Sequence, residues 1–308
     1  MKITLITTGG TIGTAETEGV RRLEKDPAEI LLGAYEAKYG KEEWRIVRAK
    51  PMLSENNGGA RITEIVELTA AALKEDCDGV IVTHGTDTLQ YTAAALRYAF
   101  GADCAPVVLV SASDPVDDPH TNALYNMRAA VNFIASGQKG VKVAYINSKA
   151  CYGLLKSNVK EPDCGIFDAD RLSAHETFSD IFVELDGAAG FPAEGVYRKG
   201  VRLVDGTVMR ISVYPGMAYP TEFPDEVKAI VFECYHSGTL RTEGEDFEAF
   251  LTAVKARGIT VFLTGVARDG ALYESAEKLS DTNFVPLCGY APIAAYVKIW
   301  YDTALSVT

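Results

Sequence analysis

The sequence is poor in the residues from which metal sites and disulfide frameworks are built. It contains four histidines and six cysteines in 308 residues, and neither type is clustered. No C-x-x-C pair occurs, and the histidines lack the short spacing of metal ligands. This scatter argues against a zinc site and predicts a reduced, cytoplasmic protein with no structural metal and no cofactor.

Long apolar runs and clustered basic residues are also missing. No stretch approaches the roughly 20 apolar residues of a membrane span, and the run Ile3–Ile6 is too short for a signal sequence. The formal net charge of -12 argues against nucleic acids and anionic membranes as partners, because phosphate-rich surfaces attract Lys and Arg. With 47% hydrophobic residues, the chain can nevertheless bury a substantial core.

Short β-branched runs alternate with helix-length segments along the chain. The runs that indicate buried strands are Ile3–Thr7, Gly79–Thr83, Val107–Ser111 and Val141–Asn147. Amphipathic helices are predicted over Thr63–Lys74, Thr88–Phe100 and His120–Ala135. This alternation predicts an α/β fold with a mostly parallel sheet and helices on both faces.

The alternation breaks between residues 186 and 206, where Gly, Pro and basic residues indicate a linker or hairpin. We therefore expect a larger N-terminal α/β domain (1–185), a linker (186–206) and a smaller C-terminal α/β domain (207–308). The elements predicted in the last domain are strands at Ile230–Tyr235 and Ile259–Leu263, a helix at Glu245–Arg257 and a final helix from about Tyr290 to Ala304.

Two turns rich in threonine and glycine follow predicted strands. The first reads TTGGTIGT at Thr7–Thr14, and the second reads THGTDTL at Thr83–Leu89. Taken alone, the first turn is compatible with anion binding or a plain turn, although its spacing matches neither common phosphate-binding pattern. The second alone is compatible with a helix cap. Because ligands bind beyond the carboxyl ends of parallel strands, the two turns together indicate one shared site.

Together these motifs resemble those of the bacterial-type L-asparaginases and glutaminase-asparaginases, most closely the cytoplasmic type I members. The resemblance extends over nearly the whole chain. It implies a flavodoxin-like N-terminal domain and hydrolysis of L-asparagine to L-aspartate and ammonia through an acyl-enzyme. It also implies a homodimer or homotetramer in which one subunit completes the active site of another.

The resemblance assigns catalytic roles to four side chains. Thr11 matches the nucleophile and Thr86 the second catalytic threonine. A threonine hydroxyl is a weak nucleophile and requires a base. The family couples its second threonine to an Asp and a Lys, which match Asp87 and Lys156 here. A lysine enclosed beside a carboxylate can relay a proton, whereas the alternative for Lys156 is a surface charge.

Substrate binding is assigned in the same way. Ser54, Glu55 and Asp87 match the positions that hold the α-carboxylate and α-amino groups, although the Ser54 segment also fits a polar turn. Backbone N–H groups around Gly10–Thr11 and Gly85–Thr86 are the expected donors to a developing oxyanion.

The segment after the first turn departs from the family pattern. Val20 stands where relatives carry a lid tyrosine, so Thr14 or Thr17 would have to replace that hydroxyl, or Thr11 is activated differently. Arg21 and Arg22 fit either recognition of an extra carboxylate or two solvated charges.

The C-terminal half departs from the pattern as well. Thr239 replaces an asparagine that binds substrate in some relatives, and either Glu274 or Glu277 matches a glutamate that a neighbouring subunit contributes. Three functions therefore stay open: hydrolysis of asparagine, hydrolysis of glutamine or another small amide, and a catalytically degenerate amino-acid-binding regulator. A role in a tRNA-dependent amidotransferase is disfavoured, because it needs an N-terminal extension and a partner, and the charge is acidic.

Overall fold

The computed structural model describes residues 1–13, 15–17, 20–22, 27–157, 159–160, 162–176, 179–266, 273, 279 and 284–307, with the backbone alone from 13 to 27. The chain forms two compact units, Met1–Glu184 with Phe191–Gly200, and Leu185–Gly190 with Val201–Thr308. The chain therefore crosses between the units more than once, within or beside the segment that the sequence marks as a linker. Part of that segment, Phe191–Gly200, belongs to the first unit.

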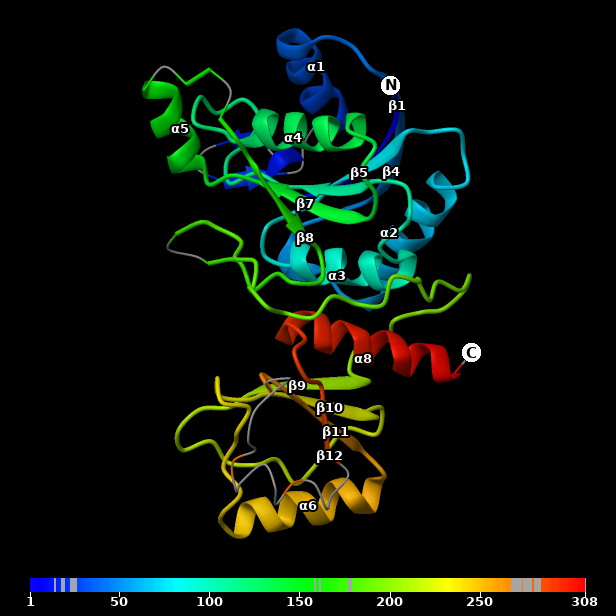
Figure 1. Cartoon of the computed structure of the whole chain (residues 1–308), viewed down its shortest axis with the longest axis vertical. Coiled ribbons are helices and arrows are strands. Elements are labelled where there is room, and N and C mark those ends of the chain that lie inside the picture. The colour runs from blue at the N-terminus through cyan, green and yellow to red at the C-terminus, as the bar shows by residue number, and fades with distance from the viewer. Residues whose placement is uncertain are drawn as a thin grey trace. The chain divides into compact units, whose positions relative to one another are not determined.

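The first unit is built on one six-stranded sheet with the order β4-β1-β5-β6-β7-β8 (Figure 1). Its strands are β1 (Lys2–Gly9), β4 (Glu43–Met52), β5 (Gly79–Thr83), β6 (Val107–Val110), β7 (Val141–Tyr145) and β8 (Gly165–Asp168). Only β8 runs antiparallel to its neighbour. Without β8, the order is that of flavodoxin-like sheets, so the predicted fold is confirmed.

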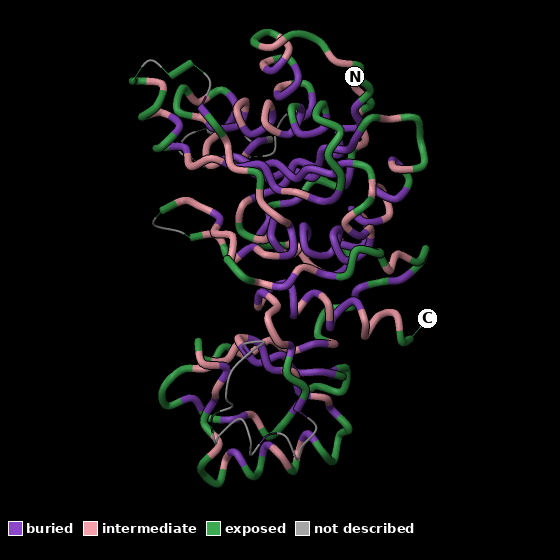
Figure 2. Tube along the Cα trace, viewed as in Figure 1, coloured by how far each residue is buried: buried purple, intermediate pink, exposed green. Residues whose placement is uncertain are grey.

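Helices cover both faces of this sheet. On one face lie α1 (Pro27–Tyr39) and α4 (Ala123–Ala135), and on the other lie α2 (Gly59–Ala72) and α3 (Leu89–Phe100) (Figure 1). The central strands are consequently buried on both sides (Figure 2), which explains their runs of β-branched residues. Among the described residues, no helix is long and apolar enough to cross a membrane.

The strand ends differ from prediction where side chains compete with the ladder. The run Val141–Asn147 was expected to be a strand throughout, but β7 ends at Tyr145. Asn147 instead caps α5 (Ser148–Lys156), because its Oδ1 accepts the N–H of Ala150 at 2.8 Å. The sequence did not predict β4, whose half-exposed side chains lack the continuous apolar run of a central strand.

The second unit contains a four-stranded parallel sheet, ordered β12-β11-β10-β9. Its strands are β9 (Val208–Ser212), β10 (Ala229–Glu233), β11 (Thr260–Thr264) and β12 (Phe284–Pro286), and its helices are α6 (Glu245–Arg257) and α8 (Pro292–Val307). Phe232 of β10 and Phe250 of α6 are fully buried in its core. The predicted helix at Glu245–Arg257 is confirmed and ends at Gly258, which adopts the left-handed φ of +63°.

Arg97 of α3 binds the segment Phe191–Gly200, which belongs to the first unit. Its side chain is buried, and Nη1 and Nη2 donate to the carbonyls of Pro192 and Phe191 at 3.1 and 3.0 Å. Its Nε lies 3.4 Å from Oδ2 of Asp170, which also accepts the N–H of Phe191 at 2.5 Å. Removing either charge would leave the other buried and unpaired.

Replacing Arg97 with Met is therefore expected to lower the free energy of unfolding by about 3–5 kcal/mol, because Asp170 loses its counter-charge. Urea denaturation measures this loss. The double variant Arg97→Met/Asp170→Asn is expected to recover part of it, because the stranded charge is removed. A single variant as stable as the wild type would contradict the role assigned to this ion pair.

Candidate active site

The two threonine-glycine turns lie against each other at the carboxyl ends of neighbouring strands. In the β1–β5 pair, Thr7 stands opposite Thr83, and the hydroxyl of Thr8 donates to the Thr83 carbonyl at 2.7 Å. Gly10 has a φ of +80°, and a Cβ on it would lie 2.5 Å from the backbone nitrogen of Gly85. The contact therefore requires glycine at position 10, both for its φ and for the space.

The backbone N–H groups around these glycines differ in whether they have a hydrogen-bond acceptor. The N–H of Gly10 donates to the carbonyl of Met52 at 3.2 Å. Of the donors expected around Gly10–Thr11, the Gly10 amide is therefore already used within the protein. The N–H groups of Gly85 and Thr86 have no hydrogen-bond partner in the described part of the chain. The half-buried Thr11 starts the 3₁₀ turn η1 (Thr11–Gly13) directly after Gly10.

Ser54 and Asp87 form a polar corner beside the second turn. Ser54 begins the 3₁₀ turn η2 (Ser54–Asn56), is buried, and donates from Oγ to Oδ2 of Asp87 at 2.9 Å. A Cβ on Gly85 would lie 2.5 Å from this hydroxyl, so the serine packs directly on the turn. Asp87 and Glu55 are both exposed, and no described cation forms a salt bridge with either. The corner therefore presents negative charge to a ligand.

A partly buried hydrogen-bond network lies behind this corner and was not predicted. Asn57 donates from Nδ2 to the hydroxyls of Thr88 and Thr92, both at 3.1 Å. Thr88 Oγ1 donates to the Ser54 carbonyl at 2.9 Å. Thr92 Oγ1 lies 2.9 Å from Nε2 of His84, a fully buried residue of the second turn. The only signal in the sequence was the position of His84 inside that motif.

Burial lowers the pKa of His84 from 6.5 to about 4, against the opposing effects of the Gly85 carbonyl and the Asp87 charge. The imidazole is therefore neutral at pH 7.

Two predicted residues lie elsewhere. Lys156 is the last residue of α5 and is exposed, with Nζ 4.7 Å from the centroid of the Tyr152 ring. The described contacts include none between Lys156 and Thr86 or Asp87, so the predicted coupling of Lys156 to Asp87 is absent from this structure. Its ammonium group instead lies over the ring of Tyr152, four residues earlier in the same helix.

Thr239 belongs to the second unit, in a tight turn after β10. The N–H of Tyr235 donates to its carbonyl at 3.0 Å, and its hydroxyl lies 2.8 Å from that of Ser237. Its role in substrate binding stays a prediction.

For the segment after the first turn, the structure gives the backbone only. The strands β2 (Ala15–Thr17) and β3 (Val20–Arg22) pair antiparallel, with Thr17 opposite Val20. The predicted residues that lie outside the described residues are Thr14, Glu274 and Glu277 and the side chains of Thr17, Val20, Arg21 and Arg22.

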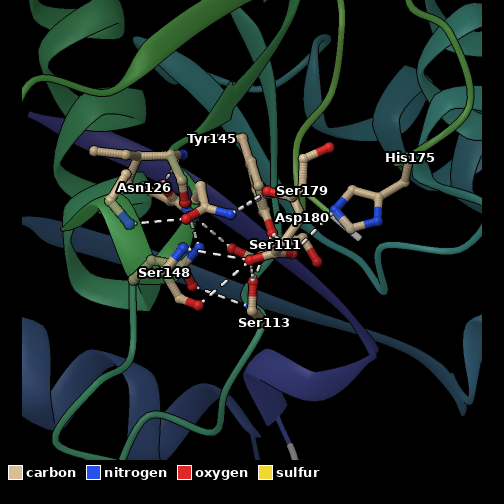
Figure 3. A network of polar contacts seen from close by, with 12 residues as sticks. Ser111, Ser113, Asn126, Tyr145, Ser148, His175, Ser179 and Asp180 are labelled. Atoms are coloured by element: carbon tan, nitrogen blue, oxygen red, sulfur yellow. Dashed lines mark hydrogen bonds and ion pairs between the residues drawn. The ribbon is translucent and has the colours of Figure 1, made fainter. Parts of the chain in front are cut away.

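A second polar cluster lies at the carboxyl ends of β6 and β7 (Figure 3). Its centre is Asp180, a non-glycine residue with a φ of +52°. Asp180 accepts hydrogen bonds from the hydroxyls of Ser113 and Tyr145 at 2.6 and 2.7 Å, and His175 Nε2 lies 3.2 Å from its Oδ1. The N–H of Ser148, at the start of α5, donates to Oδ2 at 3.3 Å.

Burial opposes the charge of Asp180, but these donors hold the pKa of its carboxyl well below the usual range. The cluster draws on separate segments without a shared spacing, so the sequence could not reveal it.

The close approach of the turns can be tested by adding one methyl group. Gly10→Ala is expected to lower the free energy of unfolding by about 1–3 kcal/mol, because alanine is strained at this φ and its Cβ meets the Gly85 backbone. Gly33→Ala in α1 is the control, because a Cβ there meets nothing within 4 Å. It is expected to be neutral or stabilising. Equal effects of the two substitutions in urea denaturation would contradict the contact.

The buried imidazole predicts a pH dependence of stability. Because the pKa of His84 is lower in the folded than in the unfolded state, stability is complete above pH 6.5 and is lost as the pH falls toward 4. The expected loss is on the order of 3 kcal/mol. Denaturation of wild type and His84→Gln at several pH values measures it, since the variant lacks this titration. A stability difference between the two that does not change with pH would disprove the assignment.

Comparisons with known proteins place the chain in a family. The profile of the family "Asparaginase, N-terminal" matches residues 2–180. An L-asparaginase from Thermococcus kodakarensis is 30% identical, over 98% of this chain and 92% of that protein. One component of a glutamyl-tRNA(Gln) amidotransferase, from Pyrobaculum aerophilum, is 42% identical over 42% of this chain, a match that spans only 31% of that protein.

A solved structure shares the fold over the whole length. The L-asparaginase I from Vibrio cholerae superposes with a TM-score of 0.73 at 18% identity, covering 100% of this chain and 94% of that one. With the family profile covering more than half of the chain, and two contacting threonine-glycine turns at the sheet edge, this protein belongs to the asparaginase family of amidohydrolases.

Proposed function

We propose that this protein is an L-asparaginase, which hydrolyses the side-chain amide of L-asparagine to L-aspartate and ammonia. The observation that carries the proposal is the packing of the Thr11 and Thr86 turns against each other, with Ser54 and Asp87 beside them. This arrangement combines two hydroxyls, open backbone donors and an unneutralised carboxylate.

The carboxylate supports an amino acid as the substrate. Asp87 attracts the α-ammonium group. Glu55, which directly follows Ser54 in the sequence, adds a second negative charge. The Ser54 hydroxyl donates to Asp87 in this structure and turns toward the α-carboxylate when substrate binds. The amide side chain then extends toward the two turns.

The chemistry proceeds through an acyl-enzyme. Thr11 Oγ1 attacks the amide carbon and loses its proton, and the carbonyl oxygen becomes an oxyanion that the N–H groups of Gly85 and Thr86 stabilise. The C–N bond breaks, the nitrogen leaves as ammonia with the proton taken from Thr11, and water hydrolyses the ester.

Lys156 carries the proton in this proposal. To do so, its side chain has to leave the Tyr152 ring and reach Asp87 when substrate binds, and it has to act as the neutral amine. The amine then accepts the Thr11 proton and returns it to the departing nitrogen.

The assembly and compartment are part of the same proposal. We propose a homodimer or homotetramer, in which Thr239 and either Glu274 or Glu277 of a neighbouring copy complete the site. A cytoplasmic location agrees with six free thiols. Light scattering after gel filtration tests the assembly.

A second candidate substrate is glutamine or another small amide. It is favoured by the relatives named as components of glutamyl-tRNA(Gln) amidotransferases, of which one from Pyrococcus furiosus is 31% identical over 97% of this chain. Ammonia release from a panel of asparagine, glutamine and small amides separates these substrates. Saturable binding of asparagine without ammonia from any compound would instead indicate a regulator.

Substitution tests the assigned residues. Thr11→Ala is expected to lower kcat for ammonia release by at least about 10³-fold, because the nucleophile is removed, while Thr11→Ser retains part of the activity. Thr86→Ala, Asp87→Asn and Lys156→Met are expected to lower it as well. Thr252→Ala, an exposed threonine of α6, is the control. Full turnover by Thr11→Ala would remove Thr11 from the mechanism, and the same outcome would remove each of the others.

A further inference from the structure

We infer that His84 is a positioning residue, which, with Thr92 and Asn57, holds the Gly85–Thr86 peptide so that the Thr86 N–H points toward the reacting carbonyl oxygen. This inference rests on the proposed function and extends it to residues that touch neither substrate nor nucleophile. We refer to Asn57, Thr92 and His84 as the relay.

The chemistry of the partners fixes the direction of each hydrogen bond. Nδ1 of His84 lies 2.9 Å from the carbonyl oxygen of Gly85, which can only accept, so Nδ1 carries the proton. A neutral imidazole has one N–H, so Nε2 accepts from the Thr92 hydroxyl at 2.9 Å. The Thr92 oxygen in turn accepts from Asn57 Nδ2 at 3.1 Å. Only one tautomer of His84 satisfies all three contacts.

The relay sets the orientation of one peptide plane. In a trans peptide, the carbonyl of one residue and the N–H of the next point in opposite directions. The Gly85 carbonyl is held on the side of the fully buried His84, so the Thr86 N–H points away from it. That N–H has no partner within the described residues, and Thr86 is only half-buried. Glycine at position 85 would otherwise allow the peptide to rotate.

The other end of the relay reaches the substrate-binding loop. Asn57 donates its second Nδ2 proton to Thr88, whose hydroxyl donates to the Ser54 carbonyl. The Oδ1 atom of Asn57 is buried without a partner among the described residues. Asn57 is therefore held in place through its amide nitrogen, and the same two bonds position both Ser54 and the Thr86 N–H.

The main test breaks the relay at its middle without changing side-chain volume. Thr92→Val is expected to lower kcat for L-asparagine by about tenfold with KM changed less than about threefold, because a misaligned oxyanion donor acts in the transition state. Thr92→Ser keeps the hydroxyl and is expected to restore kcat. The control is Thr69→Val in α2, because Thr69 Oγ1 is equally buried but has no partner in the described chain. It should leave kcat unchanged.

Substitution of His84 tests the contact with the peptide. His84→Asn places an amide N–H where Nδ1 lies and is expected to keep more of kcat than His84→Leu, which has no donor. Equal kcat for Asn and Leu, or a Thr92→Val enzyme with wild-type kcat and only a lower Tm, would overturn the inference in favour of a structural role.

A measurement independent of activity separates this inference from the proposed function. Nitrogen-15 NMR of the imidazoles, with His84→Asn to assign the signal, is expected to show the Nδ1–H tautomer for His84 at pH 7. The Nε2–H tautomer would overturn the relay even in an active enzyme. A wild type that releases no ammonia from any amide would disprove the proposed function, while the tautomer still decides whether the relay exists.

Discussion

The contact between Gly10 and Gly85 is the constraint on which the rest of the site depends. Two neighbouring parallel strands bring their turns to the same edge of the sheet. A Cβ at position 10 would meet the Gly85 backbone, and a Cβ at position 85 would meet the side chain of Ser54. Because neither glycine has a Cβ, the two backbones come into contact. Thr11 directly follows one of these glycines in the sequence, and Thr86 directly follows the other. Ser54 packs on the same glycine at position 85, so the Ser54–Asp87 corner and the two turns meet at one backbone contact.

A buried polar layer supports that contact from behind. The apolar strands bury His84 completely, and each polar atom of its ring has a partner. Such a network is costly to leave incomplete, because an unpaired polar group in an apolar interior loses its hydration without compensation. The same burial that keeps the imidazole neutral makes its two hydrogen bonds costly to break.

The parts of this structure that the sequence predicted are those with a local signal. The buried strand Gly79–Thr83 and the helix Glu245–Arg257 have the predicted bounds, because a continuous apolar run and a capped charged helix are local features. The edge strand β4 has no such run and was not predicted. The predicted coupling of Lys156 to Asp87 depended on the distance between the two side chains, which their positions in the sequence do not determine. In the structure Lys156 lies over Tyr152. The Asp180 cluster and the relay arise only when distant segments meet.

The repeated crossing of the chain between its two units has a consequence for any attempt to divide the protein. A fragment ending at residue 185 would keep Arg97 and Asp170 but lose Phe191 and Pro192, whose carbonyls bind the guanidinium. Without residues 191–200, the ion pair between Arg97 and Asp170 would be exposed to water. A single cut therefore does not separate the chain into its two units. Recombination with a relative has to exchange residues 191–200 together with α3.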